Sequence, residues 1–163
     1  MAPSAFNAQP WYFLIIKNRN TIEKMRKVVL KSANRHPSLP PKTIRQYKTF
    51  FNAPYIISVC LDTSKRWYLD PAAIHPQTLE DAMDNPDYFS VATAAQNIML
   101  AAHSMGLGAC WVAPHSIFRS KLEKLLDIRP PFKLITNITI GYYNKKSGKP
   151  MRKKLKAIHR FAR

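Results

Sequence analysis

The sequence predicts a single domain of mixed helices and strands that is built around one buried helix. Residues 86–105 are apolar on nearly every side, which is typical of a helix enclosed by a core. Other runs have the length of strands or the spacing of amphipathic helices. A chain of 163 residues is also long enough to bury one core. We therefore expect one domain over residues 1–163, with residues 145–163 as a basic C-terminal arm.

The predicted central helix has start and stop signals. Asn85 is a candidate N-cap, Pro86 fits the first helical position, and Asp87 suits the positive end of the helix dipole. Gly106 stands where a helix stops in a left-handed conformation, and a short apolar strand is predicted directly afterwards, over residues 109–113. A core helix with no further role is the simplest interpretation of this pattern.

The remaining elements follow from local patterns. Apolar residues at helical spacing predict further helices over residues 21–33, 42–51 and 116–126. We expect Ser116 to cap the last of these helices. Apolar runs of strand length predict strands over residues 11–17, 55–61 and 132–142, of which 55–61 reads as a central strand. Residues 62–85 are polar and proline-rich, which favours an irregular excursion over the surface.

The charge balance is strongly basic. Lys and Arg number 26 against 9 Asp and Glu, giving a net charge of +17. Such a balance favours anionic partners, which include phosphate-bearing cofactors, acidic proteins, nucleic acid and anionic membrane surfaces. No apolar run reaches the length needed to cross a bilayer, and the N-terminus lacks a signal-peptide core, so we expect no membrane partner.

The two cysteines indicate a cytoplasmic protein. Cys60 and Cys110 both lie in apolar, strand-like surroundings, and they lack the spacing of metal ligands. We therefore expect reduced core thiols and no metal site.

The C-terminal tail combines charge with an apolar pattern. Residues 145–163 are rich in Lys and Arg, and Met151, Leu155, Ile158 and Ala162 recur at helical spacing. A basic amphipathic helix or an arm is predicted. Two interpretations stay open for it: a solvated basic face, or a site for a phosphate or a partner.

The N-terminus reads as a tight polar loop. Residues 2–10 contain Pro, Ser and Asn, which favour turns, and they lead directly into the strand at 11–17. Asn7 and Gln9 offer both donors and acceptors. Such a loop suits a planar ligand with heteroatoms on its edge, and an ordinary surface turn is the alternative.

Three stretches together carry a family resemblance. The first stretch is residues 2–11, which read Ala-Pro-Ser-Ala-Phe-Asn-Ala-Gln-Pro-Trp. The second is residues 95–102, Ala-Gln-Asn-Ile-Met-Leu-Ala-Ala, running into residues 106–111, Gly-Leu-Gly-Ala-Cys-Trp. The third is the strand at 138–142 leading to residues 150–155, Pro-Met-Arg-Lys-Lys-Leu. In this order and spacing the chain resembles the nitroreductase family of flavin enzymes, and the first stretch is similar to that family's Pro-Ser-x-x-Asn-x-Gln-Pro-Trp signature.

The resemblance implies an α+β homodimer, with a mostly antiparallel central sheet flanked by helices and one FMN per subunit at the dimer interface. By residue match, it implies that FMN contacts come from a loop, a strand and a basic pair. The loop residues are Pro3, Ser4, Asn7 and Gln9. The strand, whose amides face the reactive N5 side of the ring, contributes Trp111, Val112 and Ala113. The basic pair at the phosphate is Arg152 and Lys153.

The implied activity is that of an oxidoreductase. Flavin passes reducing equivalents from NADH or NADPH to a nitroaromatic, a quinone or a similar small acceptor, and the protein orients it. No side-chain acid or base is required, so we assign no catalytic residue. Two alternatives remain: a flavin-binding or flavin-free protein of the same fold without turnover, and a basic nucleic-acid-binding protein. Nucleic acid is the less expected partner, because no known binding motif accompanies the charge.

The family usually has a further helix or two before the Pro-Ser loop. That segment opens with an Arg-x-Ser-x-Arg type motif that grips the FMN phosphate. No such segment precedes the loop in this sequence, and two explanations stay open: the start codon is misassigned, or the form is shortened. In the shortened form, phosphate binding would depend on Arg152, Lys153 and the general positive charge.

Overall fold

The computed structural model describes residues 1–36, 39–65, 86–143 and 151–161. Its strands are β1 (Trp11–Ile16), β2 (Tyr55–Asp62), β3 (Gly108–Val112) and β4 (Phe132–Gly141). Its α-helices are α1 (Arg19–Asn34), α2 (Pro41–Phe50), α4 (Pro86–Ser104) and α5 (Ser116–Leu125). Short 3-10 turns are η1 (Ala5–Asn7), η2 (Thr63–Lys65) and η4 (Leu155–Ala157). These elements confirm the predicted helices and strands to within a few residues. The candidate cap Asn85 and most of the excursion predicted at 62–85 lie outside the described residues.

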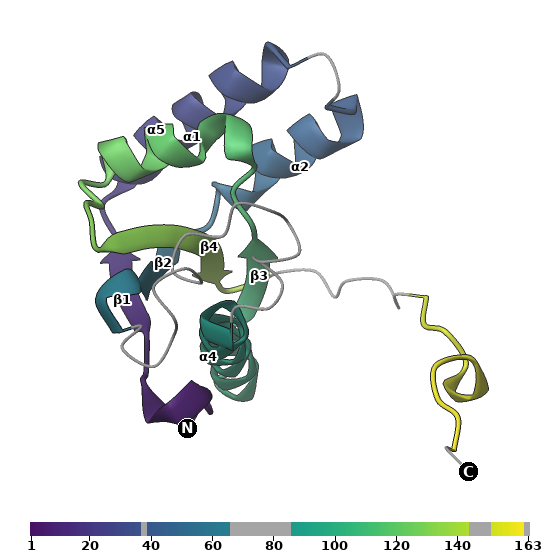
Figure 1. The fold of residues 1–163 in the computed structure, drawn as a ribbon. Coiled ribbons are helices and arrows are strands. Elements are labelled where there is room, and N and C mark those ends of the chain that lie inside the picture. Colours follow the sequence, from purple (N-terminus) through teal and green to yellow (C-terminus); the bar gives the residue numbers. More distant parts are fainter. Residues whose placement is uncertain (37–38, 66–85, 144–150, 162–163) are drawn as a thin grey trace.

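The strands form one antiparallel sheet in the order β1-β2-β4-β3 (Figure 1). β2 therefore has a neighbour on both sides, which confirms that the apolar run at 55–61 is a central strand. The two inner strands also carry a buried polar pair, in which the Ser58 hydroxyl lies 2.7 Å from the Asn137 side-chain oxygen. Since polar groups removed from water need partners, this bond favours one register of β2 against β4. The fold is α+β, with helices on both faces of the sheet.

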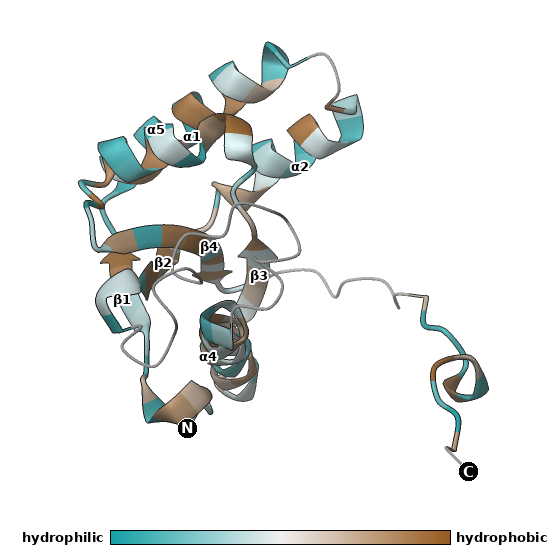
Figure 2. Cartoon of the chain, viewed as in Figure 1, coloured by the Kyte–Doolittle hydropathy of each residue, from teal (hydrophilic) through white to brown (hydrophobic). Residues whose placement is uncertain are grey.

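Helices α1, α2 and α5 cover one face of the sheet, and α4 covers the other (Figure 1). Two clusters of buried side chains fill the two layers. The cluster under the three helices includes Ile22, Met25, Val29, Phe51, Phe118, Leu122 and Leu134. The cluster between the sheet and α4 is smaller and contains Val59, Leu61, Val91, Ala95 and Ile138. Figure 2 shows hydrophilic colour along the outer sides of α1, α2 and α5, as expected for helices with one buried stripe.

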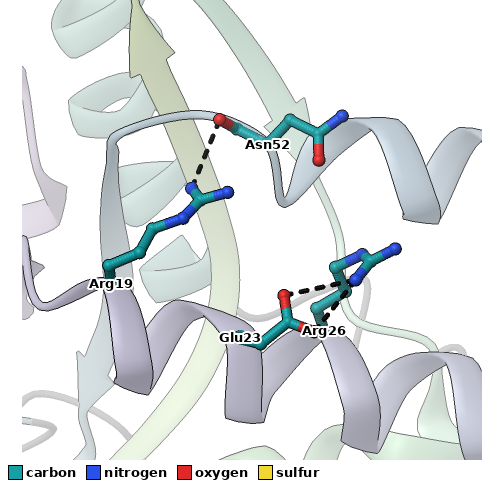
Figure 3. A network of polar contacts seen from close by, with 4 residues as sticks. All are labelled: Arg19, Glu23, Arg26 and Asn52. Atoms are coloured by element: carbon teal, nitrogen blue, oxygen red, sulfur yellow. Dashed lines mark hydrogen bonds and ion pairs between the residues drawn. The ribbon is translucent and has the colours of Figure 1, made fainter.

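The start of α1 is tied to the turn before β2. Asn18 caps the helix, since its side-chain oxygen accepts a hydrogen bond from the amide of Thr21 at 3.1 Å. Arg19 donates to the carbonyls of Asn52 at 3.4 Å and Ala53 at 3.3 Å (Figure 3). These contacts join two segments more than thirty residues apart and hold the helical layer over the strand ends.

The central helix is buried on one face only. Gly106 has a φ of 73° and ends α4 as predicted, and the amide of Leu107 donates back to the carbonyl of Ala102 at 2.8 Å. The exposed fractions of Phe89, Leu100 and Met105 are nevertheless 61%, 56% and 72%. The expectation of a helix buried all round is therefore wrong for the single chain. The reason is that one sheet covers only one side of α4.

One smaller expectation also needs correction. The cap of α5 is His115 rather than Ser116, because the His115 ring nitrogen accepts from the amide of Ile117 at 3.3 Å. Of the two forms predicted for the tail, an amphipathic helix or an arm, the structure has an exposed arm over residues 151–161, with the short turn η4. Figure 1 shows this arm standing away from the sheet and its helices. None of the helices in the described ranges is long and apolar enough to span a membrane.

The core of the helical layer provides a test of the fold. Phe118 on α5 is fully buried and meets the ring of Tyr47 on α2 edge-on, with 5.3 Å between the ring centroids. Phe118→Ala should lower the free energy of unfolding by about 3–5 kcal/mol, because it removes a buried ring and leaves a cavity. Chemical denaturation measures this loss. The control Ile15→Ala alters an exposed side chain and should change stability by less than about 1 kcal/mol. Equal effects of the two variants would contradict this arrangement.

Candidate functional site

The N-terminal loop is clamped onto the first half of α4. The amide of Ala5 donates to the Ser90 hydroxyl at 3.1 Å, and the Thr93 hydroxyl donates to the carbonyl of Pro3 at 3.0 Å. Both bonds join residues at least eighty-five positions apart in the chain. The loop is therefore held in place by tertiary contacts, and it is not an ordinary free turn at the chain end.

The loop also carries backbone strain. Phe6, Asn7 and Gln9 have φ angles of 49°, 54° and 48°, a region that non-glycine residues seldom adopt. A hydrogen bond from the amide of Gln9 to the Ser4 hydroxyl, at 3.1 Å, closes the loop on itself. Strain of this kind persists only where surrounding contacts impose it, and it gathers at ligand-binding segments. The side chains of Asn7 and Gln9 are exposed, and the Gln9 side-chain nitrogen donates to the carbonyl of Asn7 at 3.4 Å. The Asn7 side-chain amide and the Gln9 side-chain oxygen are accessible to a ligand.

The second candidate segment is β3 and the residue after it. β3 is an edge strand paired only with β4, so part of its backbone N–H and C=O groups point away from the sheet. Val112 is buried in the core beneath the helical layer, whereas Trp111 packs against the core on the α4 side. Ala113 is exposed. These alternating directions follow from the two-residue period of a strand.

A small pocket adjoins this edge of the sheet. Its volume is about 140 Å³, and it is lined by α2 and by the end of β3. The side chains of Gln46, Tyr47 and Phe50 form the helical wall opposite Trp111 and Val112. Sites for cofactor-sized ligands are usually about 300–1,000 Å³. The pocket of a single chain is thus too small to enclose a cofactor, and it could form only part of a cofactor site.

The loop and β3 lie at opposite edges of the sheet, because the loop leads into β1 and the strand order places β1 and β3 at the two ends. Val112 pairs with Asn137, Asn137 with Ser58, and Ser58 with Leu14. Three strand spacings therefore separate β3 from β1, which is about 14 Å, and the loop lies beyond the start of β1. One chain does not bring these two sets of candidate residues together.

The basic pair is also apart from both segments. Arg152 and Lys153 are exposed on the arm, and the Arg152 guanidinium donates only to the carbonyl of Met151, at 3.2 Å. The guanidinium is thus free to bind an anion.

Neither cysteine is suited to covalent catalysis. Burial, with a smaller contribution from the Glu123 carboxylate, raises the pKa of the Cys60 thiol to about 12. Burial also raises the pKa of Cys110. Because the thiolate is the nucleophile, both groups are inert near neutral pH. Within the described ranges, no group of three or more His, Cys, Asp or Glu side chains could hold a metal ion.

Ser90 and Thr93, which hold the loop, were not among the residues that the sequence singled out. Both lie on the side of α4 that contacts the N-terminal loop. Two hydroxyl residues three positions apart lie on the same side of a helix, so on an otherwise apolar helix they are a weak sequence signal for a polar contact there.

The chain was compared with known families and proteins. The family model described as the nitroreductase family matches residues 1–142. A protein from Methanothermobacter thermautotrophicus that is named as an NAD(P)H nitroreductase is 32% identical over 116 residues. The match covers 71% of this chain and 44% of the relative, so the chain spans less than half the length of that protein.

Solved structures share the fold. The crystal structure of a protein from Parabacteroides distasonis, also named as an NAD(P)H nitroreductase, is 26% identical with a TM-score of 0.68. The match covers 98% of this chain and 77% of that chain. The crystal structure of a nitroreductase with bound FMN from Desulfitobacterium hafniense has a TM-score of 0.70 at 18% identity, covering 99% of this chain and 80% of that one.

The buried thiol predicts how stability depends on pH. The pKa of Cys60 is about 12 in the folded chain and 9.0 in the unfolded one, so folding favours the neutral thiol. Its contribution to stability is present in full below pH 9 and is lost as the pH rises toward 12. Unfolding free energies measured between pH 8 and pH 11 should therefore fall more steeply for the wild type than for Cys60→Ala. Parallel curves would contradict a buried neutral thiol.

Proposed function

Because the chain belongs to the nitroreductase family, as the match over residues 1–142 shows, we propose that it is an FMN-dependent oxidoreductase. It takes reducing equivalents from NADH or NADPH and passes them to a nitroaromatic, a quinone or a similar small acceptor. The observation that carries the proposal is the strained N-terminal loop, with Asn7 and Gln9 exposed, which bears the family's signature residues.

The proposed FMN contacts fit the chemistry of the residues present. Pro3, Ser4, Asn7 and Gln9 would hold the ring edge and the ribityl chain, since exposed amides can donate and accept along a planar heterocycle. The outward backbone groups of β3 around Trp111 would bond the N5 side of the ring.

The chain supplies orientation rather than acid–base chemistry. When bound, FMN carries the hydride between donor and acceptor. The hydroxyls of Ser90 and Thr93 fix the loop against α4, so that Asn7 and Gln9 present their amides in one geometry. Tyr47 and Phe50 of α2 line the small pocket at the end of β3 and would offer ring surfaces for contact there. We assign no catalytic side chain.

We further propose that the active form is a homodimer. The loop and β3 lie at opposite edges of one sheet. A flavin ring that contacts both therefore requires the loop of one subunit and the β3 strand of its partner. The outer face of α4 presents Phe89 and Leu100 to solvent, and Met105 directly after the helix is exposed as well; monomers seldom expose such large apolar side chains together. A second copy would bury this face.

The arm has a place in the same proposal. Met151, Leu155, Ile158 and Phe161 are all exposed in the single chain, as large apolar side chains are when their packing partner is elsewhere. We propose that residues 145–163 belong to the same domain as the rest of the chain and lie against the partner subunit. Arg152 and Lys153 would then reach the FMN phosphate, where cation–phosphate hydrogen bonds are strong.

The free thiols of Cys60 and Cys110 fit the reducing cytoplasm.

FMN binding tests the proposed contacts. The full-length protein should bind FMN, turn yellow and be bleached by NADH or NADPH. Asn7→Ala and Arg152→Ala should each weaken FMN binding about tenfold, the effect of losing one hydrogen bond to a charged or buried group. Fluorescence titration measures both constants. Asn34→Ala on α1 and Arg160→Ala on the arm are matched controls and should leave the affinity unchanged. A protein that takes up no FMN would rule out the oxidoreductase.

The oligomeric state tests the second half of the proposal. Leu100→Glu places a charge in the proposed interface and should convert a dimer into a monomer that no longer holds FMN, because an unpaired buried charge is costly. Light scattering after size-exclusion chromatography measures the mass. Tyr55→Glu alters an exposed side chain on β2 and should remain dimeric. If Leu100→Glu is also dimeric, the α4 face is not the interface.

A further inference from the structure

A cavity in the helical layer is lined by none of the proposed flavin residues. Its volume is about 490 Å³, and it opens between α1 and α5. Cationic side chains of Lys31, Arg35 and Lys121 line it together with the apolar side chains of Val28 and Ile117. A cavity of this size falls in the usual range for small-molecule sites.

The position of one cation is fixed across the groove. The ammonium of Lys121 on α5 donates to the hydroxyl of Ser32 on α1 at 3.0 Å. Ser32 is buried, so this bond ties the ammonium of Lys121, an otherwise exposed residue, to the wall of the cavity. Lys31 lies next to Ser32 in the chain, and Arg35 follows one helical turn later. Cations from two helices therefore face the same space.

No carboxylate neutralises these cations. The described ion pairs and hydrogen bonds give Lys31, Arg35 and Lys121 no acidic partner. The acidic residues of α1 and α5 are engaged elsewhere. Glu23 pairs with Arg26 at 2.9 Å (Figure 3), and Glu123 accepts from the amide of Leu134 at 2.9 Å. Among the described residues, no carboxylate therefore compensates the charge in the groove.

The helices around the groove are rich in cations. Helices α1, α2 and α5 carry many Lys and Arg but only Glu23 and Glu123 as acids, whereas α4 carries no Lys or Arg at all. The basic helices lie on the face of the sheet opposite α4 (Figure 1). The exposed arm is a second basic region of the chain. The positive field of the helical layer attracts anions to the groove.

From these observations we propose that the groove between α1 and α5 binds a small soluble ligand with a diphosphate group. The three cations match the charge of a diphosphate ester, and Lys121, held by Ser32, provides a preformed contact. Val28 and Ile117 supply an apolar wall for the organic part of the ligand. The site is separate from the proposed flavin site, because its lining includes no residue of the small pocket at the end of β3 and none of the loop or arm residues proposed to hold FMN.

Inorganic pyrophosphate is the probe, added to the full-length protein saturated with FMN so that any phosphate site for FMN is filled. Isothermal titration calorimetry at constant ionic strength gives the dissociation constant. The double variant Lys31→Met/Lys121→Met should weaken pyrophosphate binding about a hundredfold, since each charged contact is worth about tenfold. Arg35→Gln should weaken it about tenfold by the same reasoning.

The matched control is Lys24→Met/Lys124→Met, which removes the same charge from the same two helices outside the groove. It should alter the affinity by less than about threefold, because exposed charges at a distance are screened by salt. Equal losses in both double variants would mean diffuse attraction of polyanions, as in nucleic-acid binding, and would overturn the proposal. The absence of pyrophosphate binding to the wild type would overturn it as well. Because FMN is saturating throughout, neither result depends on the oxidoreductase activity.

Discussion

The pairing of β2 with β4 at the centre of the sheet is the constraint on which the other elements depend. Both strands are covered on both faces, and Ile56, Leu61, Leu134 and Ile138 are fully buried. A strand enclosed in this way needs a nearly continuous apolar sequence and a partner for every backbone group. The hydrogen-bonded pair of Ser58 with Asn137 satisfies the polar side chains at this point. With the centre occupied, β1 and β3 are left for the two edges.

The position of the edge strands divides the proposed flavin site. The strained loop precedes β1, and Trp111 belongs to β3, so the sheet itself keeps them apart. α4 contacts both segments but brings only its inner face to the sheet. Its outer face keeps Leu100 and Phe89 in solvent. An incomplete site and an uncovered apolar face thus have the same structural origin, and a second copy of the chain would resolve both.

The two faces of the sheet also differ in electrostatics. The face covered by α4 is apolar and almost free of charge, whereas the helical layer on the other face is basic. The groove lined by Lys31 and Lys121 lies within this basic layer. The positive charge of the chain therefore lies partly in the helical layer and partly on the exposed arm, and α4, whose outer face the proposed dimer would bury, carries no Lys or Arg.

The sequence by itself determined the elements, because their causes are local: apolar spacing, strand-length runs, the glycine stop at Gly106 and the burial of Cys60. It also identified the loop residues as a set, since their signature is contiguous. Only the tertiary structure decided the strand order and the one-sided burial of α4. It also decided that Ser90 binds the N-terminal loop and that Lys31 and Lys121 line one cavity. These features depend on contacts between residues far apart in the chain, and no local pattern records which elements will be neighbours. Even the cap of α5 moved by one residue to His115, because a ring nitrogen can replace a hydroxyl as acceptor.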